Sequence, residues 1–348
     1  MSTTRPGRAS LALVGGALVA ALASACVSAG PGGATPTTES ALPTLETTTA
    51  PAFTSSSSGA PSTRGAASQS DLDQRLRDAA WANDLPAVRD LVAQGADVNA
   101  KDDTQQSAYL VATSEGYLDL LNLTLAHGAD VASKDSFNGT GLIRAGERGH
   151  TGVVGRLIRA GVEIDHVNRL GLTALHEAII LGKGTPAYDD TVRVLVAGGA
   201  DVRLLSRRDG VAPLDQARSK GSARQVATLD KALRQDAAGP VDKAEADRRL
   251  RVAAETGDAD GVALALRAGA DQETPDDRRR TPLLLAATND RVDVARVLVA
   301  LGANPNAVDA QHDTRGWSQG SPAAWPCSRR CCRPTPTSPS GTGSAACR

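Results

Sequence analysis

A short motif recurs through the chain at a constant interval, and this periodicity constrains the fold more than any other feature. The glycine that opens the motif, usually followed by Ala-Asp, stands at Gly95, Gly128 and Gly161, each 33 residues after the last. The same spacing of 33 separates Gly269 and Gly302. A period of this length is typical of repeat proteins, in which each unit buries its apolar face only by stacking on its neighbours.

A second motif keeps the same period and phase. It occurs as Ser107-Ala108-Tyr109-Leu110, Thr140-Gly141-Leu142-Ile143, Thr173-Ala174-Leu175-His176, Ala212-Pro213-Leu214-Asp215 and Thr281-Pro282-Leu283-Leu284. Over roughly residues 71–310 the chain resembles the ankyrin family, whose repeat is a β-turn followed by two antiparallel helices that open on a TPLH-type motif. The resemblance implies an all-α ankyrin-repeat solenoid of helix-turn-helix units with short β-turns.

The residues of the motifs have physical reasons to recur. A Thr such as Thr281 can cap the first helix by accepting a backbone N–H, and Pro282 suits the first helical position because its missing N–H is not needed there. A glycine such as Gly302 can end the second helix in a left-handed cap. Only 2% of residues are aromatic, which suits narrow gaps between helices that Ala and Leu can fill.

About seven repeats fit the register. They start near Asp71, Thr104, Phe137, Leu170, Asp209, Glu245 and Arg278. The segment Gly182–Asp190 lengthens the turn between two helices, either as a surface insertion or as a finger that offers Tyr188 to a partner. A second break, at residues 235–246, precedes a segment that resembles the start of the repeats. We therefore expect two tandem arrays, 71–238 with about five repeats and 239–314 with about two; one continuous stack with a long loop is the alternative.

The first 26 residues resemble a bacterial lipoprotein signal peptide. Arg5 and Arg8 precede an apolar run, Leu11–Ala23, that is too short to span a bilayer and suits export. Small residues then lead to Cys26, and the resemblance implies that this cysteine is lipidated. Residues 27–70 are rich in Ser, Thr, Pro, Gly and Ala, a composition that predicts a disordered tether. We expect the chain to be exported and held at the outer face of the membrane, or in the periplasm.

The last segment, 315–348, departs from the repeat pattern. Thr314 lies 33 residues after Thr281, where another repeat should begin. Codons for Trp and Cys, and most codons for Ser, begin with T. In a shifted reading frame this T becomes the middle base of the new codon, and codons with a middle T encode apolar residues. We hypothesise that a reading-frame change near Thr314 replaced a repeat with a non-native tail. The tail's four cysteines lack the spacing of a metal site.

Composition and motifs favour binding over catalysis. With 38 basic and 39 acidic residues the chain has no basic excess that would indicate a nucleic-acid partner. No Walker, G-x-S-x-G or H-E-x-x-H motif occurs. We therefore expect no enzyme activity, no catalytic residue, no metal and no cofactor, and a monomer that touches the membrane only through its lipid.

The ankyrin resemblance places binding on the β-turn tips and the first-helix faces, which line a concave groove in that family. Aromatic residues and Arg are favoured at binding hot spots. The candidate partner-binding residues are Phe137, Arg208, Arg169, Lys101, Lys134, Arg279 and Tyr188. The expected function is a non-catalytic protein–protein interaction module at the cell envelope, with a protein partner; the alternative is an accessory protein, of immunity or chaperone type, that stabilises or inhibits one co-exported enzyme.

Overall fold

Most repeat units open on a helix whose first turn is capped as the motif predicts. In the computed structural model, which describes residues 68–182 and 184–310, Ser107 Oγ accepts the Leu110 N–H and Thr281 Oγ1 accepts the Leu284 N–H, both at 3.3 Å. Thr140 differs, because its buried hydroxyl makes no hydrogen bond in the described part of the chain. The backbone of Thr140 instead forms an isolated β-bridge with Lys134.

The described residues form helices and turns and contain no β-strand. The helices are α1 (Gln69–Trp81), α2 (Leu85–Ala93), α3 (Ala108–Glu115), α4 (Leu118–Ala126), α5 (Gly141–Arg148), α6 (Thr151–Arg159), α7 (Ala174–Leu181), α8 (Pro186–Ala197), α9 (Pro213–Ser219), α10 (Ala223–Ala238), α11 (Lys243–Thr256), α12 (Ala259–Arg267), α13 (Pro282–Thr288) and α14 (Val292–Ala300). The all-α ankyrin-type solenoid predicted from the repeats is therefore confirmed.

The outer helix of most repeat units ends at the glycine that sets the period. At the end of α2, Gly95 has φ +97°, and the next residue, Ala96, donates its N–H to Leu91 O at 3.0 Å. A left-handed residue followed by this long-range bond is the Schellman arrangement, which satisfies carbonyls that the helix leaves unpaired. The chain can thus reverse into the next loop after each repeat.

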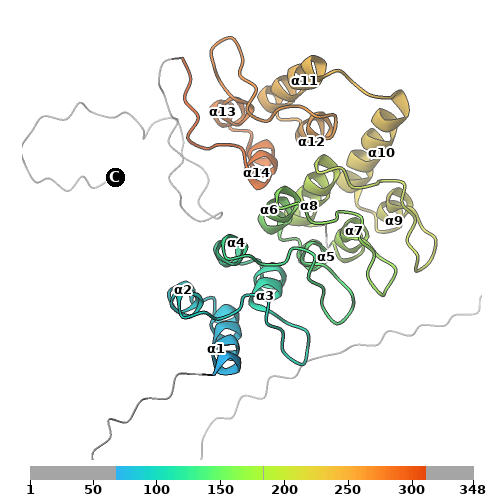
Figure 1. Ribbon diagram of the computed structural model, residues 1–348. Coiled ribbons are helices and arrows are strands. Elements are labelled where there is room, and N and C mark those ends of the chain that lie inside the picture. The colour runs from blue at the N-terminus through green and yellow to red at the C-terminus, as the bar shows by residue number, and fades with distance from the viewer. Residues whose placement is uncertain (1–67, 183, 311–348) are drawn as a thin grey trace, which may run out of the picture. The chain divides into compact units, whose positions relative to one another are not determined.

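Helices α1 to α10, here called the first array, stack in two rows. The inner helices α1, α3, α5, α7 and α9 pack on one another in chain order, and so do the outer helices from α2 to α10 (Figure 1). Their contacts bury mainly Leu, Val and Ala, with Tyr109 as the largest fully buried side chain. This composition explains how the chain forms a core with few aromatic residues.

Helices α11 to α14, the second array, lie against the outer helices of the first. Inner helices α11 and α13 stack on each other, whereas α12 packs on α8 and α10, and α14 packs on α6 and α8 (Figure 1). The last outer helix of the first array, α10, has 16 residues where α2, α4 and α6 have nine each. We call the contact between the outer helices of the two arrays the seam.

A cluster of buried charges lies in the seam. Asp260 of α12 accepts hydrogen bonds from Arg193 Nε at 2.8 Å, Thr228 Oγ1 at 2.8 Å and Lys231 Nζ at 3.1 Å. Arg193 also donates to Asp190 Oδ1 at 3.0 Å. Each charge therefore has an opposite charge beside it, as burial away from water requires.

Two element boundaries differ from those expected. Helix α1 begins at Gln69, inside the expected tether, because Ser68 and Asp71 form a capping box. Helix α8 begins at Pro186, so that Tyr188 lies in a helix rather than in a long loop. The signal peptide with Cys26, nearly all of the tether and the tail 315–348 lie outside the described residues.

Candidate functional site

We call the loops before the inner helices α3, α5, α7, α9 and α13 tips. Those before α3, α5, α7 and α13 share one local structure. In each, a side-chain oxygen accepts two backbone N–H groups: Asp135 Oδ1 accepts those of Phe137 and Gly139 at 2.8 Å, and Asn168 Oδ1 accepts those of Leu170 and Leu172 at 3.0 Å. Asp102 and Asp276 do the same in their own tips. Such bonds are typical of Asx turns, and they fix the direction of the residues at the outer end of each tip.

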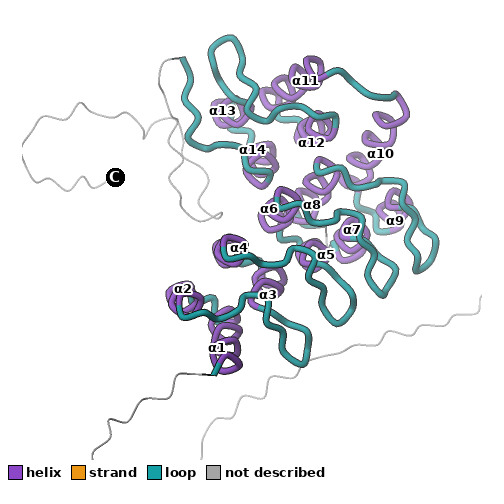
Figure 2. The backbone as a smooth tube through the Cα atoms, viewed as in Figure 1, coloured by secondary structure: helices purple, strands orange, loops and turns teal. Residues whose placement is uncertain are grey.

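Hydrogen bonds join neighbouring tips of the first array into a continuous row. The Arg169 N–H donates to Phe137 O, and the Arg207 N–H donates to Gly171 O, each at 2.8 Å. Lys101 Nζ reaches across to Lys134 O at 2.7 Å. Figure 2 shows these loops projecting side by side from the first array. We call the outer residues of these tips the tip row.

The tip row brings together most of the residues that the sequence predicted. Phe137 is 55% exposed, Arg169 and Arg208 are exposed, and the Arg169 guanidinium donates to Ser136 O at 2.6 Å. Lys101 is exposed and Lys134 is half-buried. These side chains form one surface, although their function as a binding site stays a prediction.

Two predicted residues lie elsewhere. Arg279 is exposed on the tip of the second array, before α13. Tyr188 is half-buried: its hydroxyl donates to Glu147 O at 3.0 Å, and its ring lies against Gly149 at the turn between α5 and α6. Of the two alternatives for this segment, the side chain of Tyr188 ties α8 to the preceding repeat, which favours packing over a finger that offers Tyr188 to a partner.

The sequence analysis missed two apolar members of the row. Leu170 is 51% exposed and Leu205 is 54% exposed. Leu170 follows Phe137 by 33 residues and has the same place in its tip, so the repeat register could have identified it. Leu205 carries no such signal, because its repeat follows the insertion that changes the spacing.

Charged side chains support the row from the inner helices. Glu177 of α7 is buried and accepts a hydrogen bond from Asn168 Nδ2 at 3.0 Å. Burial raises the pKa of Glu177, and the bond from Asn168 offsets part of this rise. Arg144 of α5 lies 3.4 Å from Asp135 Oδ2. Asn168 and Asp135 also hold the tips, so these contacts fix the tips to the helices beneath them.

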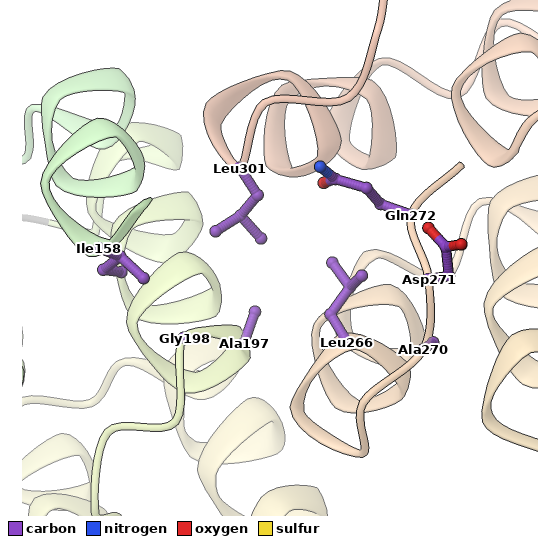
Figure 3. A pocket seen from close by; sticks show the side chains of 8 residues that line it. All are labelled: Ile158, Ala197, Gly198, Leu266, Ala270, Asp271, Gln272 and Leu301. Atoms are coloured by element: carbon purple, nitrogen blue, oxygen red, sulfur yellow. The ribbon is translucent and has the colours of Figure 1, made fainter. Parts of the chain in front are cut away.

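The seam contains a hollow at the carboxyl ends of four outer helices (Figure 3). It has a volume of about 340 Å³, and its walls are about equally polar and apolar, with Ile158, Leu266 and Leu301 lining it from both arrays. Asp271 and Gln272 are the polar side chains among its lining residues. No catalytic set of side chains lines this hollow.

The described residues contain no group of His, Cys, Asp and Glu side chains arranged to hold a metal ion. Among the same residues, no helix combines the length and apolar character needed to cross a membrane.

Comparison with known proteins agrees with this architecture. Residues 108–206 match the family model for ankyrin repeats in three copies, and residues 278–310 match the model for a single ankyrin repeat. The chain is 33% identical over 135 residues to the ankyrin repeat protein YahD of Escherichia coli, which covers 38% of this chain and 67% of the relative. It is 33% identical over 146 residues to the B-cell lymphoma 3 protein homolog of Mus musculus, covering 42% of this chain and 32% of the relative.

A crystal structure of an ankyrin repeat domain from Acinetobacter baumannii is 48% identical, with a TM-score of 0.44, and the match covers 45% of this chain and 80% of that one. The chain thus spans about two thirds of the Escherichia coli relative but about one third of the mouse relative. The matches to the ankyrin family models and to the Escherichia coli relative show that the chain belongs to the ankyrin-repeat family of protein–protein interaction modules.

Proposed function

We propose that the chain is a non-catalytic protein-binding module displayed at the cell envelope, and that its partner docks on the tip row. The observation that carries this proposal is the exposure of Phe137, Leu170 and Arg208 on tips whose backbones are joined by hydrogen bonds. Large apolar and Arg side chains on a backbone held by hydrogen bonds suit a binding hot spot, because the backbone that carries them is already ordered when a partner binds. Solenoid proteins use such extended surfaces for recognition.

The binding proposal is tested by capture from the envelope fraction with the whole tagged chain as bait. The test variant carries Phe137→Ala and Arg208→Ala. The matched control carries Val308→Ala and Arg278→Ala, which remove an exposed Val and an exposed Arg from the second array. One protein that is enriched by wild type and control but lost with the test variant supports the tip row. Equal capture by all three contradicts it.

The captured protein also separates the two functional alternatives. An exported enzyme whose activity or stability changes when the chain binds would favour the accessory role over a general adaptor. Several unrelated partners would favour the adaptor.

We also propose that lipid on Cys26 anchors the chain, with the Ser-, Thr- and Pro-rich segment that follows as a spacer. Mass spectrometry of the mature N-terminus should find a diacylglycerol-modified cysteine, and Cys26→Ser should move the protein from the membrane fraction to the soluble fraction. An unmodified N-terminus at another residue would contradict the anchor and leave the binding proposal intact.

A further inference from the structure

Exposed apolar and basic side chains coincide in the middle of the tip row. Phe137, Leu170 and Leu205, each more than half exposed, lie on three consecutive tips. The same tips, residues 134–139, 167–171 and 205–210, carry four basic side chains: Lys134, Arg169, Arg207 and Arg208. They carry two acidic ones, Asp135 and Asp209.

The acidic side chains do little to neutralise this surface. Asp135 is buried, where it accepts backbone N–H groups and faces Arg144 at 3.4 Å. Asp209 is exposed and accepts the Val211 N–H at 3.3 Å, and it forms no ion pair among the described residues. Arg207 is exposed and makes no ion pair there either. Arg208 interacts at longer range with the buried Glu177, whose pKa it lowers slightly against the larger effect of burial.

The other tips lack this combination. The tip before α3 carries Lys101 with Asp102 and Asp103, and it has no exposed large apolar residue. In the second array, the tip carries the exposed Arg278 and Arg279. Its Arg280 is paired with Asp276 at 2.6 Å, Asp277 adds another acidic group, and no large apolar residue of this tip is exposed. Among the tips that the structure describes, the three middle ones therefore combine basic side chains with apolar side chains that are each more than half exposed.

The spacing of the apolar residues suits an extended segment. Phe137 and Leu170 have the same place in successive repeats, whose packed helices are spaced by ~8–10 Å. A polyproline II segment has three residues per turn and rises ~3.1 Å per residue, so side chains three positions apart lie ~9 Å apart on one face.

We propose that the middle of the tip row binds an extended, acidic protein segment with apolar side chains three positions apart. The apolar side chains lie against Phe137 and Leu170, and the carboxylates face Arg207 and Arg208, with Arg169 between them. This inference rests on the proposed function, because it names the chemistry of the partner that docks there. Opposite charges across an interface raise the rate and selectivity of binding more than they raise its strength.

The test is a selection of short random peptides on phage with the whole chain as bait at low salt. The recovered peptides should share Asp or Glu residues and two apolar residues three positions apart, and their affinity should fall as salt rises. Arg207→Glu with Arg208→Glu, and separately Phe137→Ser, should each weaken the best peptide roughly tenfold or more. The matched control, Arg278→Glu with Arg279→Glu, makes the same charge change on the tip of the second array and should bind as wild type does.

Thermal unfolding of each variant shows whether it is folded, and the salt dependence of the wild type gives a readout that needs no variant. A basic or uncharged consensus, no enriched peptide, or an acidic peptide that the control loses equally would overturn the proposal. If capture from the envelope succeeds while the peptide selection fails, the chemistry assigned to the partner is wrong and the tip row as a binding site stands.

Discussion

Gly171 lies where two neighbouring tips of the row meet. It has φ +80°, and a Cβ placed on it would lie 2.5 Å from the backbone nitrogen of Arg208. Its carbonyl accepts the Arg207 N–H that joins the tips. Glycine is required here for two separate reasons, the left-handed backbone and the lack of space for a side chain.

Gly171→Ala should therefore destabilise the chain more than the left-handed conformation alone explains. That conformation costs an L-residue about 1–2 kcal/mol, and the clash adds to it. Gly128→Ala is the control, because Gly128 has φ +81° with nothing within 4 Å of its would-be Cβ. Urea unfolding should show a larger loss in the free energy of unfolding for Gly171→Ala than for Gly128→Ala. Equal losses would mean that the two tips can move apart at no cost in stability.

At the scale of the elements, α8 and α12 are joined by a buried ion pair in addition to their apolar side chains. In α8 every side chain from Asp189 to Val196 is buried, including Asp190 and Arg193. Burial alone would raise the pKa of Asp260, but hydrogen bonds from Arg193 and Thr228 outweigh burial and hold this pKa below its usual value. The ionised carboxylate of Asp260 is thus the centre of the cluster.

Removing Asp260 should be costly because it leaves Arg193 buried beside a single carboxylate. Breaking a buried ion pair in this way typically costs about 3–5 kcal/mol, and we expect Asp260→Ala to approach that range in urea unfolding. Asp215→Ala removes the partner of an exposed ion pair with Arg218, 2.9 Å away, and should cost less than about 1 kcal/mol. Similar losses for the two variants would show that water reaches the cluster.

Asp190 should make the seam more stable in mild acid. Burial raises its pKa to about 6 from an ordinary 3.8, and Arg193 and Arg296 offset only part of the rise, while Asp293 adds to it. The carboxyl group of Asp190 therefore binds its proton more tightly in the folded state than in the unfolded state. The stability gained from this proton is complete below pH 3.8 and is lost as pH rises through about 6. Between these values the free energy of unfolding of wild type should fall relative to that of Asp190→Asn, by on the order of 1–3 kcal/mol. A difference that is constant with pH would contradict the raised pKa.

The repeat register predicts local features well and the seam poorly. It locates the caps at Ser107 and Thr281 and the tip residue Phe137, because each depends on contacts within one repeat or between neighbours of known spacing. It contains nothing about which outer helices meet across the two arrays. Asp260 looks like a solvated charge in the sequence, since its partner Arg193 lies 67 residues away. Asp190 is three residues from Arg193, and the pair looks like one on an exposed helix face. Such contacts depend on the direction in which the second array folds back on the first, and no short sequence motif specifies that direction.

At the scale of the whole described molecule, the outer helices of the two arrays meet at the seam, and the tips of both arrays point away from it (Figure 1). Arg267 of the second array strengthens this arrangement: its guanidinium pairs with Asp236 at 2.9 Å and donates to Ala200 O at 2.9 Å. The tip row is therefore left clear of the second array, while the outer face that α6 and α8 would expose is covered.

Helices α6 and α14 are so close that adding one methyl group, by a Gly to Ala substitution in α6, tests whether they pack against each other. Gly155 lies in α6, where an added Cβ would collide with the carbonyl of Ala300 at the end of α14. Gly152, three residues earlier in the same helix, would place its Cβ in ordinary contact, 3.7 Å from Leu118. Gly to Ala inside a helix ordinarily stabilises by about 1 kcal/mol.

The two substitutions should therefore have opposite signs. Gly152→Ala should raise the free energy of unfolding by up to about 1 kcal/mol, whereas Gly155→Ala should lower it by about 1–3 kcal/mol as the overpacked helices separate. Small-angle X-ray scattering should find a larger radius of gyration for Gly155→Ala alone. If both variants gain stability and keep the wild-type radius, α14 does not lie against α6 in solution, and the second array is free to expose the outer face of the first.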